Sequence, residues 1–183
     1  MPHLPSLPAN ATLVDVYKRS PAVAAATLAL NDAIMRNSTV FSAAECEAIA
    51  AYVSKLNACQ YCLGVHTSAA VNLGMDTDDV HAICERPEMP NNPRLAPVLS
   101  YVAKLTVDPA RIDSGDVQRV LDAGWDDAAV SHAAFIAALY CFMNRIVDGH
   151  GIRGSEEQLA AGGKRLAEIG YSGLAKLLAG HPA

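Results

Sequence analysis

The chain has 183 residues, of which 51% are hydrophobic and 5% aromatic. This length predicts one domain whose core is large enough to hold the fold without a bound cofactor or a disulfide framework. The net charge is −5, and lysine and arginine form no cluster. Because nucleic-acid binding needs a basic surface, the charge pattern argues against a nucleic-acid partner.

Cysteine usage and the apolar runs predict a cytoplasmic protein. The five cysteines are irregularly spaced apart from Cys59 and Cys62, a pattern typical of a reducing compartment. The N-terminal sequence MPHLPSLPAN has no basic region, so no secretory signal is expected. The longest apolar run, Ala133 to Met143, is too short to cross a bilayer, so no membrane association is expected either.

Helical periodicity recurs along nearly the whole chain, whereas no window alternates as a strand would. Ser20 and Pro21 mark one helix start, and Ser42 with Glu45 forms a capping box at another. The proline-rich stretch 86–93 is predicted to be a linker. The expected fold class is therefore all-α. The predicted helices cover residues 21–35, 42–56, 58–74, 77–85, 94–106, 114–123, 126–148 and 155–169, with a short terminal helix from residue 171.

The strongest chemical signal is the spacing E-x(11)-C-x-x-C-x(3)-H, formed by Glu47, Cys59, Cys62 and His66. Three residues separate the cysteines and four separate Cys62 from His66, so on a helix these three side chains share a face. Cys59 is expected in the first turn of its helix, where free N–H groups and the helix dipole favour a thiolate. Glu47 falls on a stripe of small residues, so its carboxylate is expected to be half buried.

This motif in an all-helical chain resembles that of the alkylhydroperoxidase AhpD-like family, within the carboxymuconolactone decarboxylase-like superfamily. The segment Tyr140 to Gly151 also resembles the second-half helix of the family's peroxidase-related members. The resemblance implies a helical fold. The length predicts a single domain over residues 1–183, and a faint echo between the two sides of the linker suggests two similar helical layers, with the dithiol at the start of a core helix. The resemblance further implies trimers or larger rings, and cofactor-free, thiol-dependent reduction of hydroperoxides. The implied reductant is an external dithiol, such as a lipoyl-bearing adaptor or a small dithiol.

Peroxide reduction needs a thiolate, a proton for the leaving alkoxide, and a second thiol that traps the sulfenic acid. We expect Cys62 to attack, because His66 one turn further on takes its proton while Glu47 orients the imidazole. Cys59 then closes the disulfide. The opposite order stays open, since Cys59 lies nearer the helix N-terminus. Tyr61 stands where the family's type enzyme has a histidine, and its hydroxyl is expected to take part in the relay through a hydrogen bond.

Two other functions remain open. Cysteine, histidine and carboxylate side chains are zinc ligands, so the same residues are compatible with a metal-binding, non-enzymatic oligomer. The superfamily also includes decarboxylases that act on a lactone acid, although that reaction has no use for a C-x-x-C pair. Thioredoxin-type disulfide exchange is usually found in a βαβ setting, which this chain lacks.

The remaining thiols and polar residues are weaker candidates. Arg145 and Asp148 are three residues apart, so they are expected to form an ion pair within one helix. Alternatively, Asn144 or Arg145 lines the active pocket or a subunit interface. Three cysteines in apolar helical runs are expected to pack in the core: Cys46, Cys84 and Cys141.

Overall fold

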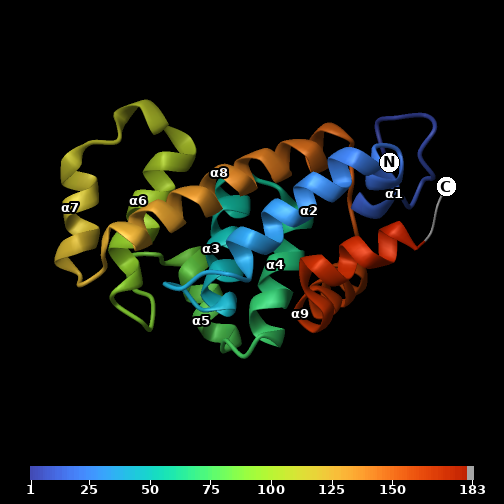
Figure 1. The fold of residues 1–183 in the computed structure, drawn as a ribbon. Helices are drawn as coiled ribbons and strands as arrows, with labels where there is room; N and C mark the ends of the chain where they lie inside the picture. Colours follow the sequence, from blue (N-terminus) through green and yellow to red (C-terminus); the bar gives the residue numbers. More distant parts are fainter. Residues whose placement is uncertain (181–183) are drawn as a thin grey trace.

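Helices joined by loops make up residues 1–180, the part of the chain that the computed structural model describes (Figure 1). No strand occurs in that range, which confirms the all-α prediction. The elements are α1 (Leu13–Lys18), α2 (Pro21–Met35), α3 (Ala43–Leu56), α4 (Gln60–Asn72), α5 (Thr77–Glu85), α6 (Leu95–Val107), the 3₁₀ turn η1 (Pro109–Arg111), α7 (Ser114–Asp122), α8 (Asp127–Gly149) and α9 (Glu156–Ala179).

Most helix boundaries follow the local signals in the sequence. Helices α2 and α5 have the predicted bounds, and α6, α7 and α8 differ from prediction by one residue at their ends. Helix α1 was not predicted, because its six residues carry little periodic signal. It begins at Thr12, whose backbone N–H and hydroxyl both donate to the carboxylate of Asp15. The linker 86–93 contains no helix, as expected.

Helix α3 is the centre of the fold. It packs against α4, α5, α6 and α8, and its residues from Cys46 to Ser54 are all buried. Several of them are alanines, which let the neighbouring helices approach closely. Figure 1 shows α2 and α8 running along one side of α3, with α6 and α7 at one end of the molecule and α1 and α9 at the other. The similarity of two layers stays a prediction.

Helix α8 is long and apolar enough to cross a membrane by length and composition, the one such helix among the described residues. It packs against α3, α6 and α2 in this fold, and its buried side chains recur at helical spacing. We therefore interpret α8 as a core helix whose remaining apolar surface is exposed. The absence of a membrane partner and the cytoplasmic location stay predictions.

Two glycines place α9 beside the centre of the fold. Helix α9 packs closely on α4, and a Cβ atom at Gly163 would overlap the carbonyl oxygen of Val65. The helical path breaks at Gly170, where φ is 64° and ψ is −175°, a conformation that favours glycine. The predicted separation between a helix near 155–169 and a terminal helix from residue 171 is thereby confirmed. Directly after the break, Tyr171 is buried.

Candidate active site

Glu47 is fully buried, at 0% exposure, and not half buried as the sequence led us to expect. Its Oε1 atom accepts from Arg36 Nη1 at 2.7 Å and from the Tyr171 hydroxyl at 3.1 Å. Its Oε2 atom lies 2.5 Å from His66 Nδ1. The expected burial was too low because the sequence does not show that α2 and α9 close over α3. Three donors from three helices satisfy the carboxylate, as a buried charge requires.

Neighbouring side chains stabilise the negative charge on Glu47. Burial acts to raise the pKa of the Glu47 carboxyl, but His66 and Arg36 together lower it below its ordinary value. An ionised carboxylate can only accept, so the hydrogen between Glu47 and His66 belongs to His66 Nδ1. A neutral His66 then has its lone pair on Nε2. The nitrogen that is free to act as a base is therefore fixed by the Glu47 contact.

Two tyrosines close this polar cluster. The Tyr171 hydroxyl donates to Glu47, so in the 2.7 Å contact between the two hydroxyls Tyr140 is the donor and Tyr171 the acceptor. The Tyr140 ring stands edge-on to the His66 imidazole, with ring centroids 4.5 Å apart. Burial raises the pKa of both phenols well above the ordinary value, so both remain neutral donors. We define Arg36, Glu47, His66, Tyr140 and Tyr171 as the relay cluster.

Cys59 and Cys62 are reduced and approach each other to 3.3 Å. Cys59 is the N-cap of α4, one position before the first turn in which it was expected. The chain enters the helix through Ala58, a non-glycine residue in the left-handed region with φ of 57°. Both thiols are buried, at 0% and 3% exposure. The geometry thus suits a disulfide between them, while solvent has little access to either sulfur.

The Cys62 thiol holds its proton in this conformation. A hydrogen bond to Cys59 and burial raise the pKa of Cys62 well above its ordinary value, whereas a hydrogen bond from Asn144 lowers it. The two causes that raise the pKa of Cys62 therefore outweigh the Asn144 contact that lowers it.

Asn144 links the dithiol to α3. Its amide nitrogen donates to Ser54 Oγ at 3.0 Å, and its amide oxygen accepts from Asn57 Nδ2 at 2.9 Å. Asn144 is 2% exposed and lies near enough to Cys62 to lower the pKa of that thiol, and its place in an active pocket stays a prediction. An amide N–H beside a sulfur atom stabilises negative charge on that sulfur.

Arg145 and Asp148 do not form the predicted intrahelical ion pair. Arg145 donates to the carbonyl oxygen of Cys141 at 2.6 Å, and Asp148 pairs with Arg153 at 2.8 Å. The prediction was wrong because Arg153, beyond the end of α8, reaches Asp148 from outside the helix. Of the other thiols, Cys46 and Cys84 are buried as expected, whereas Cys141 is partly exposed.

The N-terminal segment covers the dithiol. Leu7, Ala11 and Val16 pack with Cys59 and Cys62, and Val147 and Ile152 complete the same apolar cluster. We call residues 1–18 the N-terminal cover. Its polar contacts to the rest of the chain include a backbone hydrogen bond of 3.0 Å from residue 3 to the carbonyl oxygen of residue 150.

Tyr61 joins this cover to α4. The backbone N–H of Leu13, at the start of α1, donates to the Tyr61 hydroxyl. Burial, followed by charge on Cys62, raises the pKa of the Tyr61 phenol. This contact is with the cover and not with a member of the relay cluster. The expected part of Tyr61 in the proton relay stays a prediction.

Sequence reasoning did not find three members of the relay cluster: Arg36, Tyr140 and Tyr171. Arg36 follows the last residue of α2, and Tyr171 follows the break at Gly170. The signal that existed was the expected burial of Glu47, since a buried carboxylate needs donors. The sequence could not say which donors, because they lie up to 124 positions away.

A metal site was the other reading of the motif. Within residues 1–180, no group of three or more histidine, cysteine or acidic side chains is arranged to hold a metal ion. The motif is instead divided, with Glu47 and His66 in the relay cluster and the two cysteines in the apolar one. Glu47 is also engaged by Arg36, a cation that competes with any metal.

Comparison with known proteins agrees with this geometry. Residues 21–101 match the model of the Carboxymuconolactone decarboxylase family. A peroxidase-related protein of uncharacterised function from Silicibacter sp. TM1040 has a similar structure, with a TM-score of 0.73 and 24% identity over 79% of this chain and 76% of that one. No curated protein sequence matches the chain.

A second similar structure carries a more specific description. It is an alkylhydroperoxidase AhpD core, a peroxidase-related protein of uncharacterised function from Ralstonia eutropha JMP134. The TM-score is 0.73, and the identity is 20% over 81% of this chain and 78% of that one. At these identities the likeness establishes a shared fold. The family match spans Arg36, Glu47, the dithiol and His66, whereas Tyr140, Asn144 and Tyr171 lie outside it.

Proposed function

We propose that the chain is a thiol-dependent peroxidase that reduces organic hydroperoxides. The match of residues 21–101 to the Carboxymuconolactone decarboxylase family and the fold shared with peroxidase-related, AhpD-like proteins support this proposal. The observation that carries the proposal is the reduced Cys59–Cys62 pair, 3.3 Å apart, at the start of α4. The family name refers to a decarboxylase, but decarboxylation of a lactone acid needs no pair of thiols. A thiol peroxidase uses both thiols, one to attack the peroxide and one to form the disulfide.

The cycle has three steps. A thiolate attacks the terminal peroxide oxygen, the O–O bond breaks, and the leaving alkoxide takes a proton to become an alcohol. The attacked sulfur is now a sulfenic acid, and the second thiol displaces its hydroxyl group as water to form the Cys59–Cys62 disulfide. An external dithiol then reduces this disulfide by exchange and is itself oxidised. Two electrons pass from the external dithiol to the peroxide.

His66 serves as the base for Cys62 in this proposal. The Glu47 contact leaves His66 Nε2 as the free base, and Asn144 offers an N–H to the Cys62 sulfur. The hydrogen bond from Cys62 to Cys59 favours the opposite order of attack in the resting conformation.

The reductant in this proposal is an external dithiol, such as a lipoyl-bearing adaptor or a small dithiol. The N-terminal cover must move to admit it, because Cys59 is 0% exposed. Disulfide exchange requires a sulfur atom in line with the bond that it breaks. No cofactor takes part in the proposed cycle.

Self-association into trimers or multiples of trimers is part of the proposal. Helices α2 and α8 pack side by side, and outside the residues of any cavity wall they expose Leu30 and Phe135, which are 51% and 58% exposed. Large exposed apolar surfaces mark protein contacts. Light scattering at micromolar concentration should give a mass well above that of the 19.2 kDa chain, and Phe135→Glu should lower it. A monomeric wild-type protein would contradict this part.

The decisive experiment is a thiol count combined with peptide mapping. Mild treatment with cumene hydroperoxide should remove two thiols and join Cys59 to Cys62. Metal analysis of the same sample separates the redox enzyme from a metal-binding module. Oxidation that links other cysteines, or that leaves this pair reduced, would overturn the proposal.

A further inference from the structure

A cavity with a volume of about 300 Å³ lies beside the dithiol, bounded by the N-terminal cover, α2 and α8. This volume is at the lower end of the range for small-molecule sites, about 300–1,000 Å³. Its apolar walls include Val23, Phe142 and Met143. A larger cavity, of about 450 Å³, is lined by the start of α3, the end of α4, α5 and the residues around 90–95. It shares no residue with the apolar cluster that holds Cys59 and Cys62, which we call the dithiol cluster.

One layer of side chains separates the cavity from the thiols. Val16 and Ile146 line the cavity and also pack in the cluster that holds Cys59 and Cys62. Tyr17, the next residue of the wall, is close enough to Cys62 that charge there adds to burial in raising the pKa of the phenol. The Tyr17 hydroxyl donates to Met143 Sδ at 3.8 Å, a weak acceptor. This wall is held by apolar contacts that a ligand can replace.

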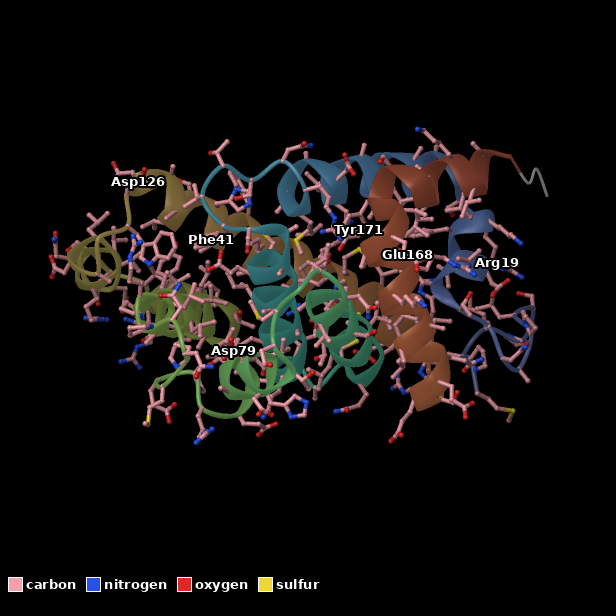
Figure 2. The ribbon with its side chains drawn as sticks, turned by 90° about the horizontal axis from the view of Figure 1, so that it is seen from below. Arg19, Phe41, Asp79, Asp126, Glu168 and Tyr171 are labelled. Atoms are coloured by element: carbon pink, nitrogen blue, oxygen red, sulfur yellow. The ribbon has the colours of Figure 1, made fainter. Side chains whose placement is uncertain are left out.

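Arg19 gives the cavity a positively charged group at its polar part. Arg19 and His150 are both lining residues, and no carboxylate lines the cavity. Arg19 Nη2 donates one hydrogen bond of 2.7 Å to the carbonyl oxygen of Ser6. A guanidinium group has five N–H donors, so others are available to a ligand. Figure 2 shows Arg19 beside the N-terminal segment, at the end of the molecule away from Asp79 and Asp126. An apolar cavity with this charged group complements a chain that ends in a carboxylate.

We propose that this cavity is the substrate site and that it takes amphipathic carboxylates, namely hydroperoxides carried on an alkyl or acyl chain that ends in a carboxylate. The carboxylate meets Arg19, and the chain lies along Phe142 and Met143 toward the wall formed by Val16 and Tyr17. Displacement of that wall brings the hydroperoxide to the dithiol, which reduces it to an alcohol and water. The substrate assignment rests on the proposed peroxidase function.

Binding is tested without turnover, with decanoate as the probe and decanol as its uncharged match. Isothermal titration of the full chain should show that decanoate binds Arg19→Gln about tenfold more weakly, the loss expected for one hydrogen bond to a charged group. Decanol binding should change by less than about twofold, because it lacks the charge. Arg111→Gln is the matched control, since Arg111 is exposed and outside the cavity. Equal decanoate affinities in the two variants would overturn the proposal.

A second pair of variants separates the cavity from a contact between subunits. Val23 and Leu30 are 55% and 51% exposed on α2, but of the two Val23 alone lines the cavity. Val23→Glu should weaken decanoate binding at least tenfold through charge repulsion, and Leu30→Glu should leave it unchanged. If both variants reduce binding equally and both lower the mass in light scattering, a second copy covers this face and the proposal fails.

Steady-state kinetics then tests the proposed substrate class separately from the proposed peroxidase function. The KM for a hydroperoxy fatty acid should rise about tenfold in Arg19→Gln, with a smaller change for cumene hydroperoxide. If the protein turns over cumene hydroperoxide but Arg19→Gln leaves the KM for the hydroperoxy fatty acid unchanged, the substrate class is overturned and the peroxidase function stands. Bound decanoate without any peroxidase activity would overturn both.

Discussion

The relay cluster and the dithiol cluster lie side by side but are built in opposite ways. Glu47 has three hydrogen-bonding partners from α2, α4 and α9, so its geometry is fixed by the packing of the core. Cys59 and Cys62 sit among aliphatic side chains beneath the N-terminal cover, and few hydrogen bonds hold that cover. The rigid cluster can set proton positions in advance, while the covered one must open for each substrate.

The difference also explains the electrostatics. In the relay cluster, charge is stabilised by partners, so the pKa of Glu47 is lowered despite complete burial. In the dithiol cluster, burial and the neighbouring thiol raise the pKa of Cys62. A thiolate therefore becomes more accessible when the cover opens and water enters.

The largest effect is expected from removing either thiol. In Cys62→Ser and in Cys59→Ser, peroxidase turnover should fall to the uncatalysed level, because neither variant can form the disulfide. Trapping of sulfenic acid followed by mass spectrometry identifies the attacking residue. Accumulation on Cys62 in Cys59→Ser supports the order given above, and accumulation on Cys59 in Cys62→Ser alone would reverse it.

Breaking the relay cluster should have the next largest effect. Glu47→Gln keeps the shape of the side chain but removes the charge that orients His66, so turnover should fall by roughly 10²–10⁴-fold. His66→Ala should reduce it at least as far, and the double variant should be little worse than either single one, since the two residues act as a unit. Steady-state kinetics with cumene hydroperoxide measures the turnover of the two single variants and the double variant.

The alkylation rate of the thiols near pH 7 provides a second readout for the same variants. Unchanged turnover together with unchanged alkylation in Glu47→Gln and His66→Ala would show that the relay is wrong, even if the cysteines are redox-active. Circular dichroism of each variant checks that the helices remain formed.

Acid should weaken the relay cluster before it affects the dithiol. The folded-state pKa of Glu47 lies below its ordinary value of 4.5, so the charge contributes stability at pH values above 4.5 and loses it as the pH falls through the folded pKa. We expect Glu47→Gln to lower the free energy of unfolding by about 1–3 kcal/mol at pH 7. Urea unfolding between pH 7 and pH 3 should show this difference shrinking below pH 4.5. A difference independent of pH would mean that shape and not charge matters.

The smallest effect is expected at the edge of the dithiol cluster. Tyr61→Phe removes the acceptor of the Leu13 N–H, which should favour opening of the cover by about 1 kcal/mol and speed alkylation of the thiols roughly fivefold. Tyr101→Phe, a buried tyrosine on α6, is the matched control and should change nothing. A loss of peroxidase activity in Tyr61→Phe without faster alkylation would instead assign the hydroxyl to the proton relay.

Local signals in the sequence determined most of the helices. Pro21 at a helix start, the Ser42–Glu45 capping box and the glycine at 170 each act within a few residues, so their positions follow from the sequence alone. The spacing of Cys59, Cys62 and His66 likewise belongs to one helix, α4, and its N-cap. The candidate residues for the proposed chemistry could therefore be named before the fold was known.

The tertiary structure alone decided how the candidate residues are divided between the relay cluster and the dithiol cluster. Arg36 reaches Glu47 from the end of α2, Tyr140 lies on α8, and Tyr171 reaches Glu47 from the middle of α9, directly after the break at Gly170. Residues 1–18 cover the thiols from the far end of the chain. Such contacts depend on which helix faces pack together, and helical periodicity gives a buried face without naming its partner. The sequence therefore determined which residues are candidates for the proposed reaction, and the packing of the helices decided which of them are charged, which are covered and which pair with one another.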